Sequence, residues 1–449
     1  MMKLPWRNSL PILFALCLAL GFVLMTPGKI EKDAGEYEAI AQSITHGQFA
    51  LDGRATMLRE PGYPLFRAFF DLLHVSPFVI LVVQAVLFAA TVGIVGAIGR
   101  RIEPRVGSLG AWAAACSYGL AVYSSRHLLE ILTAFLCAMV AWVFCRALED
   151  PKVWVWRIGT AVASGLLLLT RMSFLFLPFA LIGALFVRDF QQKIGTKKMI
   201  RNAIVTFVVF FAMLMPWVIR NGLTFGAWTI TQRTGITLYA RALKAEMPWE
   251  RLGASYVSVL LGQSLLMNVA PTANPVLIQH WKDVWQEFEA KQSQGRSDLE
   301  VDSALKQEAV AMIMSRPEVT ARFVLWSGVD LLRFMAFPSP GTPEFSIEGM
   351  FIPVAVAHQL TAKHLTILVA ADLIQFVWFA LIAASIILGF RRYGLRFVPG
   401  LIMIPVVVAH GPTDDIIRYG APLHPWFLLS IAILLIPYFR ERLKRKTSG

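Results

Sequence analysis

A carboxylate and a proline-rich turn near the start of the chain are the residues best suited to chemistry. Asp33 lies in Asp33-Ala34-Gly35-Glu36-Tyr37, directly after the first hydrophobic stretch, and the turn Arg59-Glu60-Pro61-Gly62-Tyr63-Pro64 follows. A carboxylate at the edge of a membrane core is costly to place there and usually has a function. We therefore expect these two stretches to carry the reactive groups.

The composition indicates that the elements positioning these groups cross a membrane. Of the 449 residues, 56% are hydrophobic and 16% are charged, and the apolar residues form long runs. The 13 Trp and 31 Phe suit a lipid-facing surface with aromatic belts at its ends. The sequence predicts an all-α, polytopic helical membrane protein.

The hydrophobic runs predict about 10 to 12 transmembrane helices. The ten clearest spans are residues 9–26, 77–99, 106–124, 128–145, 158–170, 173–187, 202–219, 365–389, 397–411 and 421–439. The first span follows a basic start, as in a signal peptide, but no small-residue cleavage pattern comes after it. We interpret it as an uncleaved transmembrane helix.

The net charge of +13 does not indicate nucleic-acid binding, because the basic residues collect in alternate short loops. Examples are Arg100, Arg101 and Arg105; Lys197, Lys198 and Arg201; and Arg440, Arg442 and Lys444. This positive-inside pattern predicts that both termini are cytoplasmic. Two long segments, residues 28–76 and 220–360, then fall on the outer side of a single transmembrane domain, residues 1–449.

We expect interfacial helices in these outer segments, at stretches such as 254–269 and 318–336, where apolar and charged residues mix. The polar run Glu287–Lys306 is interpreted as a solvated helix or loop, and as the most mobile part of the chain. No internal repeat and no matched pair of broken helices is visible in the sequence, which lowers the case for a secondary transporter.

Four short motifs occur in a characteristic order along the chain. They are Asp33-x-x-x-Tyr37-x-x-x-Ala41 with Gly47, Arg59-x-Pro61-Gly62-Tyr63-Pro64, Pro216-Trp217-x-x-Arg220-Asn221 with Phe225-Gly226, and Arg418-Tyr419 before Pro422 and Pro425. Their order and spacing resemble those of the GT-C superfamily of integral-membrane glycosyltransferases. The chain looks most like the bacterial branch related to protein O-mannosyltransferases and lipid A aminoarabinose transferases. Glu60 departs from the pattern, because relatives have Pro or Lys there, and it would repel a phosphate unless Arg59 or Arg54 pairs with it.

The resemblance implies transfer of one sugar, with inversion, from a polyprenyl-phosphate donor to an acceptor on the outer side of a bacterial inner membrane. The acceptor is a glycan, a lipid or a protein, and membrane lipids but no nucleic acid are the other expected partners. Such a reaction needs a carboxylate beside the attacking hydroxyl and positive charge on the departing phosphate. We expect Asp33 to supply the first. The residues expected to bind substrate are Arg59, Glu60, Tyr63, Arg171, Arg220, Asn221, Arg418 and Tyr419.

Each of these residues also has a purely structural interpretation. Asp33 could be a helix N-cap supported by Glu36, and Arg220-Asn221 could anchor a helix end in the headgroup layer. Arg171 could snorkel outward, and Tyr63 could be a belt tyrosine instead of a stacking platform for a sugar. Gly62 is expected to take a positive φ in a rigid turn.

Other polar groups give weaker signals. His127 and Glu130 lie one turn apart near an outer boundary, where a helix cap or a surface pair is the usual role. Asp414-Asp415 beside His410 offers ligands for a divalent cation, although adjacent carboxylates in a short loop are usually only solvated, so no metal ligand and no cofactor is assigned. The four cysteines match no metal spacing and are interpreted as apolar fillers: Cys17, Cys116, Cys137 and Cys145.

Two other classes of function remain open. A transporter or lipid flippase would also place charges at helix ends, but Asp33 would then couple to transport. A non-catalytic assembly protein of the cell envelope would tolerate Asp33→Asn. Charges at the outer edge of the membrane, instead of at its midplane, favour an enzyme that acts on a lipid headgroup.

Overall fold

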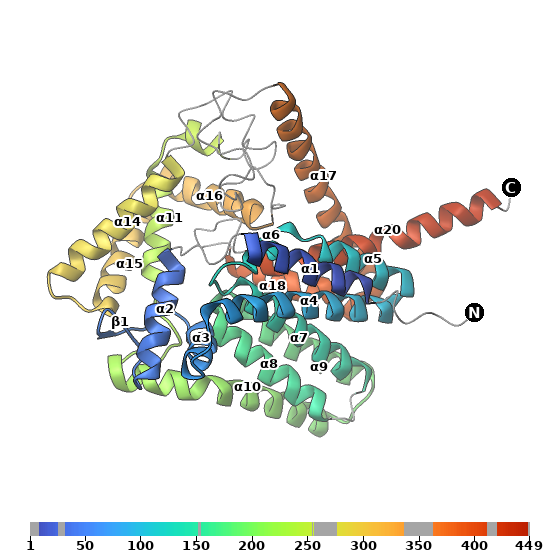
Figure 1. Ribbon diagram of the computed structural model, residues 1–449, viewed down its shortest axis with the longest axis horizontal. Helices are drawn as coiled ribbons and strands as arrows, with labels where there is room; N and C mark the ends of the chain where they lie inside the picture. The colour runs from blue at the N-terminus through green and yellow to red at the C-terminus, as the bar shows by residue number, and fades with distance from the viewer. Residues whose placement is uncertain are drawn as a thin grey trace.

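The described residues are almost entirely helical in the computed structural model, which describes residues 9–25, 32–150, 154–253, 255, 276–335, 362–410 and 420–447. Most of the apolar helices lie side by side in a bundle (Figure 1). The bundle helices are α1 (Leu10–Met25), α4 (Pro77–Ile102), α5 (Pro104–Ala115), α6 (Tyr118–Tyr123), α7 (Glu130–Glu149), α8 (Trp154–Thr170), α9 (Phe176–Gln191), α10 (Thr196–Phe225), α17 (Ala362–Tyr393), α18 (Val398–His410) and α20 (His424–Thr447). Short 3-10 turns join some of them, namely η2 (Met172–Phe174), η6 (Gly394–Arg396) and η7 (Ala421–Leu423).

The length and apolar character of these helices show a multi-pass membrane protein. In the described part of the chain, five helical stretches are long and apolar enough to cross a bilayer. They are Pro77–Ile102, Glu130–Glu149, Met172–Gln191, Thr196–Phe225 and Val377–Arg396, and shorter apolar helices occupy Leu10–Met25, Trp154–Thr170, Val398–Val407 and Ala421–Ile436. The predicted all-α, polytopic class is confirmed.

One predicted span differs from the structure. Residues 106–124 are not one helix but two, α5 and α6, because the backbone turns at Ser117, whose φ is −67° and ψ is 92°. The first of the two helices packs closely on α4 through glycines. A Cβ atom at Gly107 would lie 2.5 Å from the backbone nitrogen of Arg100 and 2.6 Å from the carbonyl oxygen of Gly96, so only glycine fits there.

At one end of the bundle lies a layer of shorter, more polar elements that we call the head (Figure 1, at the left). The head consists of α2 (Lys32–Thr45), the hairpin β1 (Ala50–Leu51) and β2 (Arg54–Ala55), α11 (Thr234–Glu246), α14 (Val276–Ser293), α15 (Asp298–Met314) and α16 (Pro317–Met335). The helix α3 (Gly62–Leu72) leads from the hairpin back to the bundle. The predicted helix at 318–336 is α16, whereas most of the stretch at 254–269 lies outside the described residues.

Local sequence explains the turns of the head. Asp52 and Gly53 have φ angles of 51° and 74°, the left-handed conformation that a two-residue hairpin needs, and Ala50 pairs with Ala55. The polar run Glu287–Lys306 forms parts of two helices. Ser297 and Glu300 make a capping box at the start of α15, since each side chain bonds the other residue's backbone N–H.

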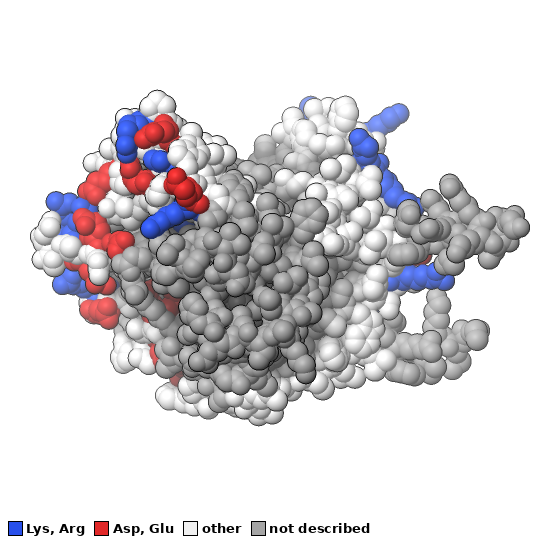
Figure 2. Space-filling model, turned by 90° about the horizontal axis from the view of Figure 1, so that it is seen from above, with Lys and Arg blue, Asp and Glu red and all other residues white. Residues whose placement is uncertain are grey.

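Charge divides the molecule along its long axis. Figure 2 shows acidic and basic side chains mixed at the end that carries the head, and mainly basic side chains at the other end, which we call the basic end. The described surface between them is largely uncharged on this face. Exposed apolar side chains such as Ile204, Phe207 and Val208 on α10 suit contact with lipid.

A buried ion pair holds three helices together at the basic end. Arg157 near the start of α8 pairs with Asp189 near the end of α9. Asn202 on α10 donates a hydrogen bond from Nδ2 to the other carboxylate oxygen of Asp189 at 3.0 Å. Arg157 is 2% exposed and Asp189 is 0% exposed. We call these three residues the inner cluster.

Candidate active site

Asp33 and Arg59 come together at the opposite end of the bundle. Nη2 of Arg59 lies 2.6 Å from Oδ1 of Asp33, and Nε of Arg59 donates to Oε2 of Glu36 at 2.7 Å. The two carboxylates are one helical turn apart on α2, so they share a face of the helix. We call Asp33, Glu36 and Arg59 the outer cluster. The guanidinium of Arg59 thus contacts both carboxylates.

The guanidinium of Arg59 is buried and keeps its positive charge. Its side chain is 5% exposed, and its guanidinium carbon lies 5.2 Å from the ring centroid of Tyr37. Burial alone would lower the pKa of Arg59, but the facing groups Tyr37, Asp33 and Glu36 raise it well above its ordinary value. Burial also raises the pKa of Tyr37, so the phenol stays protonated. Arg59 therefore stays cationic at any ordinary pH.

The alternative in which Asp33 is an N-cap does not fit the structure. The helix α2 begins at Lys32, so Asp33 lies in its first turn, and the Asp33 carboxylate contacts Arg59. Glu36 likewise contacts Arg59.

Tyr63 is buried beneath this cluster. It is 0% exposed, its ring meets that of Tyr37 edge-on at 5.1 Å, and its hydroxyl donates to Oε1 of Gln84 at 3.2 Å. Gln84 in turn donates to the backbone carbonyl of Arg126 at 2.7 Å. The Tyr63 ring thus supports α2 from below and is not available as a stacking platform in this conformation.

Glu60 connects the segment Arg59–Pro64 to the helix bundle by a hydrogen bond. Its Oε1 accepts a hydrogen bond from the backbone N–H of Met172 at 3.1 Å, at the turn between α8 and α9. The expected pairing of Glu60 with Arg59 or Arg54 is not what the structure shows. Gly62 starts α3 and does not take a positive φ. A Cβ atom there would lie 2.7 Å from Cα of Thr170, so close approach is what requires glycine.

Arg171 lies next to this turn, with Nη1 at 3.8 Å from Oε1 of Glu130. Both side chains are buried, at 9% and 2% exposed, so Arg171 does not snorkel outward and Glu130 is not a surface residue. His127, also buried, lies close enough to Arg67 for the two charges to interact. Burial, and then the charge of Arg67, lowers the pKa of His127 to about 4.

Arg220 and Asn221 brace the loop that carries the hairpin. Arg220 donates to the backbone carbonyls of Phe49 at 3.0 Å and Thr56 at 2.9 Å. Its guanidinium also lies about 5 Å from the rings of Phe49, Trp217 and Phe225. Asn221 is 0% exposed and donates to the carbonyls of Thr229 and Ile230. The sequence predicts a phosphate contact for Arg220, but here its hydrogen bonds go to two backbone carbonyls and to Oδ1 of Asn221.

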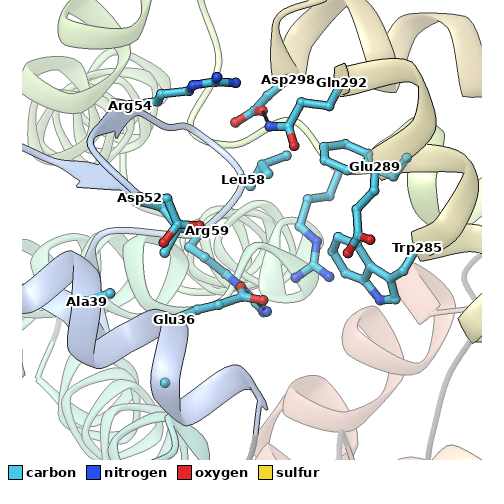
Figure 3. Close-up of a pocket in the computed structure, with 14 residues that line it drawn as sticks. Glu36, Ala39, Asp52, Arg54, Leu58, Arg59, Trp285, Glu289, Gln292 and Asp298 are labelled. Carbon is cyan, nitrogen blue, oxygen red and sulfur yellow. Dashed lines mark hydrogen bonds and ion pairs between the residues drawn. The ribbon is translucent and has the colours of Figure 1, made fainter. Parts of the chain in front are cut away.

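A cavity of about 500 Å³ adjoins the outer cluster (Figure 3). Glu36 and Arg59 form one side of it, while Trp285 and Glu289 of α14 face them across the space (Figure 3). The remaining lining residues are Gly35, Ala39, Leu51, Asp52, Arg54, Leu58, Arg233, Phe288, Gln292 and Asp298. The cavity therefore lies between the first outer segment and the second.

The sequence does not reveal most of these lining residues. Arg59 is the exception, because its motif marks it as a substrate-binding residue, whereas Glu36 is interpreted from the sequence only as support for an N-cap at Asp33. The structure brings together Asp33, Arg59 and Glu60, with Arg171 at the adjoining turn and Arg220, on α10, bonded to the loop before Arg59. Arg418 and Tyr419 lie outside the described residues.

No metal site is visible in the described part of the chain, where no group of three or more His, Cys, Asp or Glu side chains could hold an ion. Asp414 and Asp415 lie outside the described residues, as does the side chain of His410. The described cysteines are all free thiols.

Residues 61–219 match the family model of dolichyl-phosphate-mannose-protein mannosyltransferases. The matched segment includes Pro61-Gly62-Tyr63-Pro64 and Pro216-Trp217, so it confirms the resemblance to GT-C glycosyltransferases that these motifs indicate. No curated protein sequence is significantly similar to the chain.

Two solved structures align with most of this chain at low identity and low TM-score. The oligosaccharyltransferase AglB from Archaeoglobus fulgidus, in complex with an inhibitory peptide and a dolichol-phosphate, is 13% identical, with a TM-score of 0.47. The similarity covers 99% of this chain but 52% of that one, so the chain spans about half the length of AglB. ArnT from Cupriavidus metallidurans, bound to undecaprenyl phosphate, is 14% identical with a TM-score of 0.39, over 94% of this chain and 77% of ArnT.

Proposed function

We propose that the protein is a membrane glycosyltransferase that moves one sugar from a polyprenyl-phosphate donor to an acceptor hydroxyl, with inversion at the anomeric carbon. The observation that carries the proposal is the pair formed by Asp33 and Arg59 beside a cavity at the polar end of a membrane bundle. The family match over residues 61–219 supports the same class of reaction.

Asp33 is the catalytic base in this proposal. Its carboxylate, 23% exposed, accepts the proton of the acceptor hydroxyl while that oxygen bonds to the anomeric carbon. The bond between the anomeric carbon and the phosphate oxygen breaks, and its electron pair stays on the phosphate. Arg59 holds the carboxylate in place through one of its nitrogens.

The departing phosphate gains negative charge and needs cations near it. We propose Arg171 and Arg418 for this role, together with Arg59, whose guanidinium lies at the edge of the cavity. Arg220 contributes indirectly, since it ties down the loop between Phe49 and Thr56 that precedes Arg59. Glu60 is directed to the backbone of Met172, which removes the apparent conflict with a phosphate.

The orientation in the membrane is part of the proposal. The excess of Lys and Arg at the basic end supports a cytoplasmic location for that end, with both termini on that side. The head would then face the periplasm of a bacterium, and we assign the segments 28–76 and 220–360 to that side of a single transmembrane domain formed by residues 1–449. A polyprenyl chain would lie along the bundle with its phosphate near Asp33.

Release of polyprenyl phosphate from a panel of polyprenyl-phosphate sugars tests the reaction. Purified protein is supplied with crude cell-envelope extract as the source of acceptor. Asp33→Asn should lower release from the active donor by on the order of 10³-fold, as expected for loss of a general base. Glu38→Gln is the matched control, because Glu38 is also on α2 but pairs with Arg67, and it should leave release unchanged.

The control separates a catalytic role from a structural one. If the Asp33→Asn protein stays folded and consumes the donor as fast as the wild type does, Asp33 is not the catalytic base. Movement of intact donor across a vesicle membrane without release of polyprenyl phosphate would instead favour a flippase.

A further inference from the structure

We propose that the cavity between α2 and α14 is an acceptor subsite for an uncharged saccharide, with Trp285 as its aromatic platform. This inference rests on the proposed glycosyltransferase function and narrows the acceptor to a glycan. Five parts of the chain build the cavity: α2, the hairpin with the residues up to Arg59, Arg233 directly before α11, α14 and the start of α15. Its volume of about 500 Å³ is typical of a small-molecule site.

The charged groups in the lining disfavour a lipid tail as the occupant. Besides the pair of Glu36 and Arg59, two arginines and three carboxylates line the cavity, with one amide. The arginines are Arg54 and Arg233, the carboxylates are Asp52, Glu289 and Asp298, and the amide is Gln292. An alkyl chain would leave these groups desolvated without partners, which is costly.

The balance of charge also disfavours a phosphorylated occupant. Cations and anions are nearly equal in number around the cavity, so its wall offers no net attraction for a dianion. Hydroxyl groups both donate and accept hydrogen bonds, and they can therefore use carboxylate, amide and guanidinium groups at once. An uncharged saccharide presents many hydroxyls at short spacing, which matches such a mixed lining.

Two of the polar groups are held in fixed positions. Oδ1 of Asp298 accepts a hydrogen bond from Nε2 of Gln292 at 3.0 Å, and Oδ2 accepts one from the hydroxyl of Thr56 at 3.3 Å. These bonds connect α14, α15 and the hairpin loop around the cavity. Planar groups fixed in this way can direct their remaining lone pairs and N–H groups to a ligand.

The aromatic side of the cavity is also well defined. The ring of Trp285 meets that of Phe288 edge-on, with centroids 5.6 Å apart, and the guanidinium of Arg233 lies 5.9 Å from the Trp285 ring. An indole has a large apolar face and one polar N–H. The C–H face of a pyranose ring is apolar, so it can pack on such a surface while its hydroxyls reach the polar groups.

The outer cluster connects this subsite with the reaction. Arg59 lines the cavity and also contacts Asp33, and Glu36 lies one turn along α2 from Asp33. A saccharide held between Trp285 and α2 would thus present a hydroxyl toward the carboxylate that takes its proton. The subsite fixes the acceptor, whereas the donor phosphate lies toward the bundle.

Direct binding of small saccharides tests the proposal without any donor. The probes are methyl glycosides of glucose, galactose and N-acetylglucosamine and their disaccharides, and binding is followed by saturation-transfer NMR. The detergent must be zwitterionic and free of sugar, because a maltoside headgroup would compete. At least one probe should bind saturably. Trp285→Ala should weaken it about tenfold, as expected for loss of an aromatic contact.

Matched variants show whether the effect is local. Trp285→Phe should restore most of the binding, and Trp249→Ala, which removes a Trp of the head outside the cavity, should leave it unchanged. Glu289 is exposed at the cavity, so Glu289→Ala should fold normally and weaken saccharide binding. This variant takes the place of Trp285→Ala if that variant does not fold. Asp33→Asn should bind the saccharide as the wild type does while transfer is lost.

These outcomes distinguish the subsite from the enzyme. Saccharide binding that depends on Trp285, in a protein that consumes no donor, would support the subsite and contradict the proposed function. Three results would overturn the subsite. The first is that no saccharide binds saturably, and the second is that binding is unchanged by both Trp285→Ala and Glu289→Ala. The third is that an acetylated peptide displaces the bound saccharide whereas the other saccharides do not.

Discussion

Two clusters of arginine and carboxylate lie at opposite ends of the helix bundle, and they differ in how they meet water. In the inner cluster, Asp189 is 0% exposed and both of its oxygens are occupied, one by Arg157 and the other by Asn202. In the outer cluster, the carboxylates of Asp33 and Glu36 are 23% and 17% exposed and share one arginine.

The difference shows what separates a structural ion pair from a reactive one. A fully enclosed pair offers a ligand no access, and its main effect is to fix helices against each other. A carboxylate that is partly exposed can still accept a proton or a hydrogen bond from an incoming group. The cavity beside Arg59 supplies that open side.

The largest expected effect is on stability, at the inner cluster. Asp189→Asn removes the charge opposite Arg157 and should lower the free energy of unfolding by about 3 to 5 kcal/mol, because an unpaired charge is left buried. Transfer per folded molecule should stay as in the wild type. Thermal unfolding in detergent and the release assay measure the two quantities. A variant with normal stability and no transfer would mean that the inner cluster takes part in function.

The second test exchanges the arginine of each cluster for lysine. Lysine is a point charge and cannot contact two carboxylates in the planar, forked manner of arginine. Arg59→Lys should therefore lower the transfer rate by about 100-fold, which corresponds to about 2.7 kcal/mol of barrier. Arg157→Lys is the matched control and should reduce stability but not transfer per folded molecule. Equal loss of transfer in both variants would contradict the distinction between the clusters.

The sequence predicts the parts of this site that depend on local periodicity. Asp33 stands at the edge of a hydrophobic span, which marks it as a candidate, whereas Glu36 is interpreted from the sequence only as support for an N-cap. The apolar spans predict nearly all of the bundle, since their length alone suffices to cross a bilayer. The break at Ser117 has no proline, and the nearby Gly119 lies inside an uninterrupted apolar run, so the sequence predicts one span there.

Contacts between distant segments could not be predicted in the same way. The pairing of Arg59 with Asp33, and of Arg220 with the carbonyls of Phe49 and Thr56, depends on how the first loop folds over the bundle. An arginine looks the same in a sequence whether it binds phosphate or braces a loop. The sequence does not indicate a binding role for Trp285 either, because an aromatic residue on an amphipathic helix usually belongs to the core.

Acid should destabilise the end of the molecule that carries the outer cluster. His127 has an ordinary pKa of 6.5, and burial followed by the charge of Arg67 lowers it to about 4 in the folded protein. Between these values the unfolded chain binds the proton more tightly, so the free energy of unfolding decreases as pH falls from 6.5 to 4. His127→Gln should remove about 2 kcal/mol of that decrease.

Thermal unfolding of both proteins between pH 7 and pH 4 measures this effect. The control is His74→Asn, since His74 is exposed in a turn with a φ of 53° that asparagine tolerates. It should leave the pH dependence unchanged. If His127→Gln and the wild type lose stability in parallel, the acid sensitivity comes from other groups.

The smallest expected effect concerns Glu60, which ties the outer cluster to the bundle at the turn after α8. Gln offers the same carbonyl acceptor to the N–H of Met172, so Glu60→Gln should change stability by less than about 0.5 kcal/mol. Glu60→Ala leaves that N–H without its acceptor and should cost about 1 kcal/mol, with a modest loss of transfer. If Glu60→Gln instead clearly raises the rate of transfer, the main effect of Glu60 is electrostatic. The charge of Glu60 would then repel the donor phosphate, and its hydrogen bond to the bundle would be secondary.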